Sequence, residues 1–165
     1  MSHRDELLAV IRDYDADLRR VALSARAAGL IGQVMLELTQ DLDYAAAGGL
    51  TIRADPIATA MMHVAGARGD NLDAFVVREA GTAHGMQQPI EGPEIAGRRV
   101  LLVADTCTTG DSVRAALHAV RAAGAIPVAV AVVADRGTGA REKIEAEGVE
   151  YRAAYRRHDL EVRAA

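Results

Sequence analysis

Residues 100–112 read Val-Leu-Leu-Val-Ala-Asp-Thr-Cys-Thr-Thr-Gly-Asp-Ser, and this stretch decides the fold. Its first four residues are apolar, which predicts a strand buried on both faces, as in a parallel sheet with helices above and below. Residues 112–123 are expected to form a helix that ends at Gly124. A strand that runs through a short loop into a helix is typical of parallel β-α-β units, so the sequence indicates an α/β fold.

The loop between this strand and this helix has the composition of a phosphate-binding site. In a doubly wound sheet, ligands bind at the carboxyl ends of the strands, where the start of a helix presents unpaired backbone N–H groups to an anion. Small hydroxyl residues and a glycine allow the backbone to wrap around a phosphate. The expected phosphate-binding residues are Thr108, Thr109, Gly110, Asp111 and Ser112.

Asp105 stands at the end of the strand. There its carboxylate could accept hydrogen bonds from the vicinal hydroxyls of a ribose or approach a magnesium ion. The alternative interpretation is that Asp105 caps the turn and that the threonines form local hydroxyl turns. The loop contains neither the Gly-Lys-Ser/Thr of a Walker motif nor the spaced glycines of a dinucleotide fingerprint. Cys107 is expected to be a small loop residue rather than a nucleophile, because no base is identifiable beside it.

The rest of the chain alternates between helical and strand patterns. Apolar spacing predicts helices at about residues 4–12 and 22–40, and another helix with Asp55 as its N-cap and Pro56 as its first residue. Residues 79–93 lack periodicity and are expected to form a long functional loop. Further strands are expected at 44–48, 73–78, 99–105 and 127–135, and a charged helix at 139–147. The 165 residues suit a single core, so residues 1–165 are interpreted as one domain.

Composition excludes several classes of function. The formal charge of −4 and the single lysine, Lys143, give no basis for nucleic-acid binding, and no chemistry is assigned to Lys143. Cys107 is the only cysteine, which excludes an internal disulfide and fits a reducing compartment. The start of the chain is charged and no apolar run approaches the length of a membrane span, so we expect a cytoplasmic protein with no membrane partner.

The order of apolar strand, acid, Thr-Thr-Gly and helix resembles the phosphoribosyl-diphosphate (PRPP) signature of type I phosphoribosyltransferases. Three further stretches are similar to orotate phosphoribosyltransferases. The first, residues 48–56, looks like the loop that holds pyrophosphate, which implies PRPP contacts from Thr51, Ile52 and Arg53. Glycines at 48 and 49 would allow the backbone to approach a dianion, although a plain tight turn before a helix is the alternative.

The second stretch, residues 76–78, 83–85 and 90–92, looks like the mobile catalytic loop of that family, which in a dimer reaches over the PRPP of the neighbouring subunit. It implies catalytic roles for Arg78 and His84. The third, residues 132–136, resembles the strand end whose arginine contacts the orotate carboxylate, which implies base binding by Arg136 together with Thr109. Alone, an Asp-Arg pair after a strand is more often a surface ion pair.

The resemblance implies a type I phosphoribosyltransferase fold: a mostly parallel central sheet flanked by helices, with a reduced hood over the base. It implies a homodimeric enzyme that transfers the 5-phosphoribosyl group of PRPP to a nucleobase, orotate, and releases pyrophosphate. Asp105 would hold the ribose and Mg²⁺, and the magnesium ion would neutralise the pyrophosphate.

The chain also departs from the family pattern. The catalytic loop of the family carries lysines one and four residues after its arginine, where this chain has Glu79 and Thr82. The paired acids before the phosphate loop are reduced to Asp105, and the hood to about residues 15–20. Losing one preorganised donor typically costs about 3–4 kcal/mol of transition-state stabilisation. The alternative function is therefore a catalytically weakened paralogue that binds PRPP, a nucleotide or a partner as a sensor or structural subunit.

Overall fold

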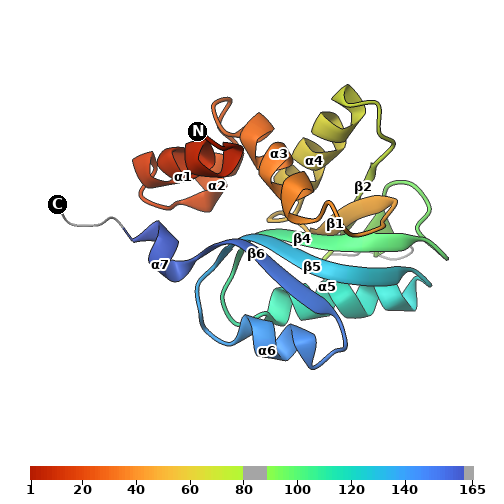
Figure 1. The fold of residues 1–165 in the computed structure, drawn as a ribbon. Coiled ribbons are helices and arrows are strands. Elements are labelled where there is room, and N and C mark those ends of the chain that lie inside the picture. Colours follow the sequence, from red (N-terminus) through yellow and green to blue (C-terminus); the bar gives the residue numbers. More distant parts are fainter. Residues whose placement is uncertain (80–88, 162–165) are drawn as a thin grey trace.

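A six-stranded sheet runs through the described residues, 1–79 and 89–161, of the computed structural model (Figure 1). Its strand order is β3-β2-β1-β4-β5-β6. All neighbouring strands pair in parallel except β3, which is antiparallel to β2. This confirms the predicted mostly parallel sheet. The strands are β1 (Ala46–Leu50), β2 (Asp73–Val77), β3 (Ile90–Glu91), β4 (Arg99–Cys107), β5 (Ile126–Asp135) and β6 (Glu150–Arg156).

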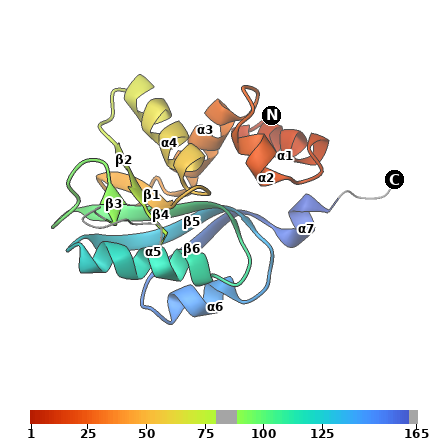
Figure 2. The same ribbon diagram turned by 180° about the vertical axis from the view of Figure 1, so that it is seen from behind.

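Helices cover both faces of the sheet (Figures 1 and 2). One face carries α1 (His3–Asp13), α2 (Leu18–Ala22), α3 (Ala28–Leu38) and α4 (Asp55–Ala67). The opposite face carries α5 (Asp111–Ala122) and α6 (Ala140–Glu145). The short helix α7 (Arg157–Leu160) follows β6 and packs against α1. No helix in the described part of the chain is long and apolar enough to cross a membrane.

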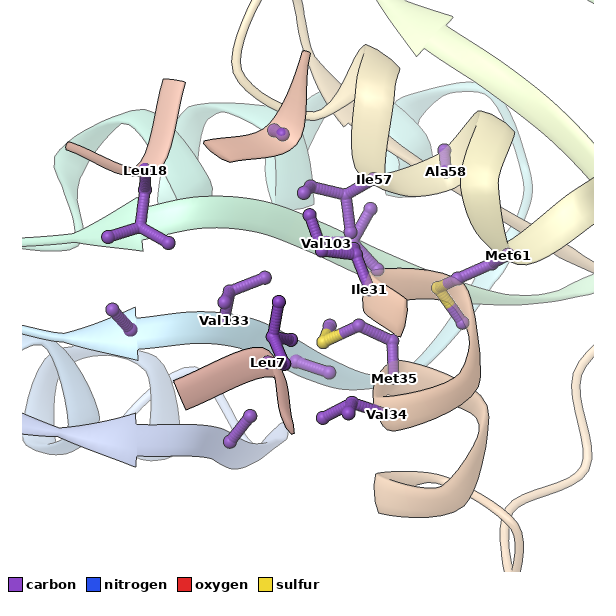
Figure 3. Close-up of a cluster of buried hydrophobic side chains, with 14 of the residues drawn as sticks. Leu7, Leu18, Ile31, Val34, Met35, Ile57, Ala58, Met61, Val103 and Val133 are labelled. Atoms are coloured by element: carbon purple, nitrogen blue, oxygen red, sulfur yellow. The ribbon is translucent and has the colours of Figure 1, made fainter. Parts of the chain in front are cut away.

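The sheet separates two hydrophobic cores. Along β4, Leu101 and Val103 contribute to one core while Val100 and Leu102 contribute to the other. Figure 3 shows the first core, where sheet residues meet side chains from four helices: Leu7, Leu18, Ile31, Val34, Met35, Ile57, Ala58, Met61, Val103 and Val133. Alternate residues of a strand point to opposite faces, so a strand covered on both sides is apolar at every position. The apolar runs in β4 and β5 are explained in this way.

Two predicted helix boundaries were wrong. The helix expected at 22–40 begins only at Ala28, as α3. Ala22 is the last residue of α2, and Leu23, which is 73% exposed, lies between the two helices. The Ser24 hydroxyl donates to the Val21 carbonyl and accepts from the Ala27 N–H, so local side-chain hydrogen bonds compete with the continuous helix. Helix α4 has Ala54 rather than Asp55 as its N-cap, because the Asp55 carboxylate accepts the Thr51 hydroxyl instead.

The last strand and helix, β6 and α7, were not predicted from the sequence. In β6, charged and aromatic residues alternate irregularly, and only Tyr151, Ala154 and Tyr155 are buried. The Tyr155 hydroxyl donates to the Arg4 carbonyl at 2.7 Å, a contact between residues 151 positions apart. Such a strand is defined by its partners rather than by its own hydrophobic period.

Gly48 and Gly49 lie inside β1, so the tight turn that was the alternative interpretation of these glycines is wrong. A Cβ at Gly48 would lie 2.2 Å from the Phe75 carbonyl oxygen, and one at Gly49 would lie 2.5 Å from the Val103 carbonyl oxygen. Both glycines are therefore explained by close approach of neighbouring strands, and not by a turn. Gly49 also lines the cavity described below.

Replacement of Gly48 by alanine is expected to destabilise the fold by about 2–3 kcal/mol, because overpacking against backbone cannot be relieved by a rotamer change. Gly29→Ala is the matched control, since a Cβ there meets nothing within 4 Å and α3 gains helix propensity. Urea denaturation followed by circular dichroism measures both. Equal stabilities for the two variants would contradict the explanation.

Candidate active site

The strand order brings two loops together at one edge of the sheet. From β1 the chain continues to β2 on one side, and from β4 it continues to β5 on the other, so the sheet changes direction between β1 and β4. Ligands of open α/β sheets bind outside the carboxyl ends of the strands at this switch point. A cavity of about 500 Å³ lies there, between the loop after β1 and the loop after β4.

The predicted phosphate loop forms one wall of this cavity. Its residues Thr108, Thr109, Gly110, Asp111 and Ser112 all line the cavity. Helix α5 starts at Asp111, and its N-cap residue, Gly110, has no side chain to cap it. Thr109 Oγ1 accepts the Asp111 N–H at 3.4 Å, and no described side chain accepts the N–H of Ser112 or Val113. Gly110 has a φ of 84° and a Cβ there would lie 3.2 Å from the Ala140 Cα, so glycine is required. The start of α5 therefore presents backbone N–H groups to the cavity, as an anion site requires.

The one acid of this loop is balanced by the one lysine of the chain. The Lys143 Nζ lies 2.5 Å from Asp111 Oδ1, and the Thr109 hydroxyl donates to Asp111 Oδ2 at 3.0 Å. Both interactions hold the pKa of Asp111 below its usual range. Lys143 comes from α6, 32 residues away, so its role could not be seen in the sequence.

Asp105 is buried, with 2% of its side chain exposed, and it is not among the described residues that line the cavity, although its neighbours Ala104 and Thr106 are. Its Oδ1 accepts the Thr106 N–H at 2.6 Å and lies 3.5 Å from Arg53 Nη1. Burial raises the pKa of Asp105, and the Thr106 N–H, Arg53 and Arg19 oppose that rise. The Thr106 bond is a local contact within β4 rather than the turn cap of the alternative interpretation, while the approach of Arg53 links the acid to the loop after β1.

The loop after β1 forms the facing wall. Thr51, Ile52 and Arg53 all line the cavity, as the sequence predicted. The Thr51 N–H donates to the Val77 carbonyl and its hydroxyl donates to Asp55 Oδ2, which fixes the loop between β2 and α4. The peptide bond between Thr51 and Ile52 is cis.

Other predicted site residues lie elsewhere. The Arg78 guanidinium is paired with the Glu91 carboxylate, and the Arg136 Nη2 donates to the Ala16 carbonyl at 3.0 Å. Neither arginine is among the described residues that line the cavity. His84 and Thr82 lie outside the described residues. The roles of Arg78, His84 and Arg136 therefore stay predictions.

Cys107 is buried at the end of β4. Burial raises the pKa of its thiol, which keeps the thiol protonated at neutral pH. This agrees with the expectation that Cys107 is not a nucleophile.

Asp105, whose neighbours Ala104 and Thr106 line the cavity, is the carboxylate that would hold a substrate-bound magnesium ion. Residues 1–79 and 89–161 contain no cluster of three or more His, Cys, Asp or Glu side chains that could hold a metal alone. Mg²⁺ is commonly held by one or two carboxylates together with substrate phosphates and water. A single buried carboxylate at Asp105 fits that arrangement.

Arg19 is a cavity residue that was not predicted. It follows Leu18 on α2, and nothing in the sequence distinguishes it from Arg20. In the structure Arg19 lines the cavity, whereas the Arg20 guanidinium stacks 5.4 Å from the centre of the Tyr14 ring. Only the orientation of this short helix separates their roles.

A switch-point cavity with a phosphate loop after β4 and a second loop after β1 defines a type I phosphoribosyltransferase. The chain matches the family model of the phosphoribosyl transferase domain over residues 53–150. An orotate phosphoribosyltransferase of Streptomyces avermitilis is 61% identical over 149 residues, which cover 90% of this chain and 82% of the relative. The orotate phosphoribosyltransferase of Mycobacterium tuberculosis H37Rv is 56% identical over 148 residues, covering 90% and 81%.

Solved structures agree with these relatives. The M. tuberculosis orotate phosphoribosyltransferase in complex with PRPP has a TM-score of 0.87 and 49% identity, covering 96% of this chain and 92% of that chain. A phosphoribosyltransferase from Corynebacterium diphtheriae has a TM-score of 0.89 and 47% identity, covering 97% and 99%. The chain belongs to the orotate phosphoribosyltransferase family. This confirms the resemblance and the fold class inferred from the sequence.

Lys143→Ala is expected to weaken the binding of inorganic phosphate about threefold, because an exposed ion pair contributes up to about 1 kcal/mol and the unbalanced Asp111 then repels the anion. Adding Asp111→Asn should restore the affinity. Calorimetry with inorganic phosphate compares the single and double variants. If Lys143→Ala weakens phosphate binding equally in the wild-type protein and in Asp111→Asn, Lys143 does not act through Asp111.

Asp105→Asn is expected to weaken PRPP binding without lowering the stability of the fold. The folded-state pKa of Asp105 is raised, so at pH 7 its ionised form opposes folding, while an amide oxygen still accepts the Thr106 N–H. We expect Tm at pH 7 to stay equal or rise. PRPP affinity should fall about tenfold or more, because a hydrogen bond to a charged group contributes about 1.5–3 kcal/mol.

Thermal scans and PRPP calorimetry test this, with the exposed Asp43→Asn as the matched control. Unchanged PRPP affinity in Asp105→Asn would remove the ribose-binding role. A lower Tm would show that the carboxylate stabilises the fold.

Proposed function

We propose that the protein transfers the 5-phosphoribosyl group of PRPP to orotate and releases pyrophosphate. Membership of the orotate phosphoribosyltransferase family makes the chain a pentosyltransferase. The observation that carries the proposal is the cavity itself, in which the phosphate loop after β4 faces the loop after β1. The whole chain, residues 1–165, acts as one phosphoribosyltransferase domain.

The two walls of the cavity hold different parts of PRPP. The start of α5, with Thr108, Thr109, Gly110, Asp111 and Ser112, holds the 5′-phosphate through backbone N–H groups and hydroxyls. Asp105 accepts hydrogen bonds from the ribose hydroxyls. Thr51, Ile52 and Arg53 hold the diphosphate from the opposite loop. The ribose ring is thereby oriented with its anomeric carbon toward the open part of the cavity.

The reaction is a displacement at the anomeric carbon. The bond from this carbon to the pyrophosphate oxygen breaks, a bond to a ring nitrogen of orotate forms, and the proton of that nitrogen is released to solvent. Positive charge develops on the ribosyl ring and negative charge on the leaving group, so catalysis depends on positioning and electrostatic stabilisation. Arg53 stabilises the departing diphosphate, and the ionised Asp105 faces the ring that becomes positive. Mg²⁺, when bound, neutralises the diphosphate and improves it as a leaving group.

The base and the second subunit complete the site. Arg136, with Thr109, binds orotate through its carboxylate. Its contact with the Ala16 carbonyl uses one of five guanidinium N–H donors, so the same side chain can hold a ligand and the chain at once. The protein acts as a homodimer in which Arg78 and His84 of the catalytic loop serve a neighbouring site. The buried, unpaired Cys107 fits a cytoplasmic setting.

The alternative of a catalytically weakened paralogue rests on Glu79 and Ala104, which both line the cavity, and on Thr82. Relatives at 55–61% identity named orotate phosphoribosyltransferase favour the enzyme. The acid at position 79 is then a feature that slows turnover rather than one that abolishes it.

A base-selectivity assay tests the function. Purified protein with PRPP and Mg²⁺ is expected to release pyrophosphate with orotate and not with uracil or purine bases, and calorimetry is expected to detect PRPP binding. The product is identified by chromatography as a pyrimidine nucleoside monophosphate. PRPP binding without pyrophosphate release from any base would support the paralogue, and the absence of PRPP binding would reject both functions.

A further inference from the structure

We infer that Arg19 of α2 binds the diphosphate group of PRPP and supplies positive charge that the loops alone do not provide. This inference rests on the proposed function, because it takes PRPP as the occupant of the cavity. It adds α2, the helix of the N-terminal hood segment, to the two loops as a third substrate-binding element.

The packing of α2 fixes Arg19 at the cavity. The helix begins after Asp17, whose side chain accepts the Arg20 N–H at 3.2 Å. Leu18 and Val21 are buried in the first core, which holds α2 against the sheet next to β4. Arg19, between these two anchors, is exposed and lines the cavity. Its place there follows from the burial of its neighbours.

The charges around the cavity show why this cation matters. The charged residues among its described lining are two arginines and two acids: Arg19, Arg53, Glu79 and Asp111. Their formal charges sum to zero, although PRPP is a polyanion. Arg53 also lies near the buried Asp105 carboxylate. In the described part of the chain Arg19 makes no hydrogen bond or ion pair with another side chain, so its guanidinium is available to a ligand.

The position of Arg19 assigns it to one end of the substrate. Arg19 and Arg53 both act electrostatically on Asp105. Helix α2 packs against β4, the strand that carries Asp105. Arg19 therefore lies on the Asp105 side of the cavity, where the ribose and its diphosphate would sit. Arginine suits this role because its planar fork binds phosphate oxygens in pairs.

Two simple anions separate the ends of the site. Pyrophosphate is used as the probe of the diphosphate position and inorganic phosphate as the probe of the α5 loop. Arg19→Gln is expected to raise the Kd for pyrophosphate with Mg²⁺, and for PRPP, about tenfold, equivalent to about 1.4 kcal/mol. The Kd for inorganic phosphate should change less than about twofold, within the range of a screened distant charge.

Arg20→Gln is the matched control, since Arg20 is the next residue on the same helix and stacks on Tyr14 outside the cavity. It is expected to leave all three affinities and turnover unchanged. Arg19→Lys, which keeps the charge, should recover part of the lost pyrophosphate affinity. Thermal scans of each variant confirm that the fold is intact.

The outcomes distinguish this inference from the proposed function. If the wild-type protein forms the nucleotide but Arg19→Gln binds pyrophosphate as the wild type does, the inference is overturned and the function stands. Equal losses of phosphate and pyrophosphate affinity, or equal effects of Arg19→Gln and Arg20→Gln, also overturn it. If the wild type binds neither PRPP nor pyrophosphate, the proposed function fails and the inference fails with it.

Discussion

The close parallel contact between β1 and β4 is the constraint on which the site depends. A Cβ at Gly49 would lie 2.5 Å from the Val103 carbonyl oxygen, so the backbone of β1 lies close against β4 near the end of β1. Because the chain leaves β1 and β4 in opposite directions, the loops that follow must diverge around a cavity. The backbone of the fold therefore forms the cavity. The main role of Gly48 and Gly49 is to allow the close approach of neighbouring strands.

Charge is distributed in this site by arginines and a single lysine that come from separate elements. Lys143 of α6 balances Asp111, and Arg53 from the loop after β1 lies near Asp105. Asp111 and Asp105 thus each lie near a cation from a different part of the chain. Lys143 lowers the pKa of Asp111 and Arg53 opposes the rise that burial causes in Asp105, while both cations limit the repulsion of a phosphorylated ligand. A chain with an overall charge of −4 can in this way hold a polyanion locally.

The parts of the fold that were predictable are those encoded locally. The apolar runs of β4 and β5 and the glycine before α5 report burial and backbone geometry directly, and the phosphate loop was identified from them. Elements set by distant partners were missed. Strand β6 has no clear period, the break at Ser24 depends on two side-chain hydrogen bonds, and Arg19 differs from Arg20 only in the direction that α2 presents.

The N-terminal segment shows how a short hood is held in place. Hydrogen bonds of the Tyr155 hydroxyl and the Arg12 guanidinium join α1 to β6 and α7. Arg136 donates a hydrogen bond to the Ala16 carbonyl, just before α2. Arg136 thus connects the end of β5 to the turn that positions Arg19. Arg136 itself is not among the described residues that line the cavity, so its hydrogen bond to Ala16 acts on Arg19 only through this turn and the start of α2. A contact at the end of β5 thereby helps to fix the place of a cavity residue that lies three positions after Ala16 in the sequence.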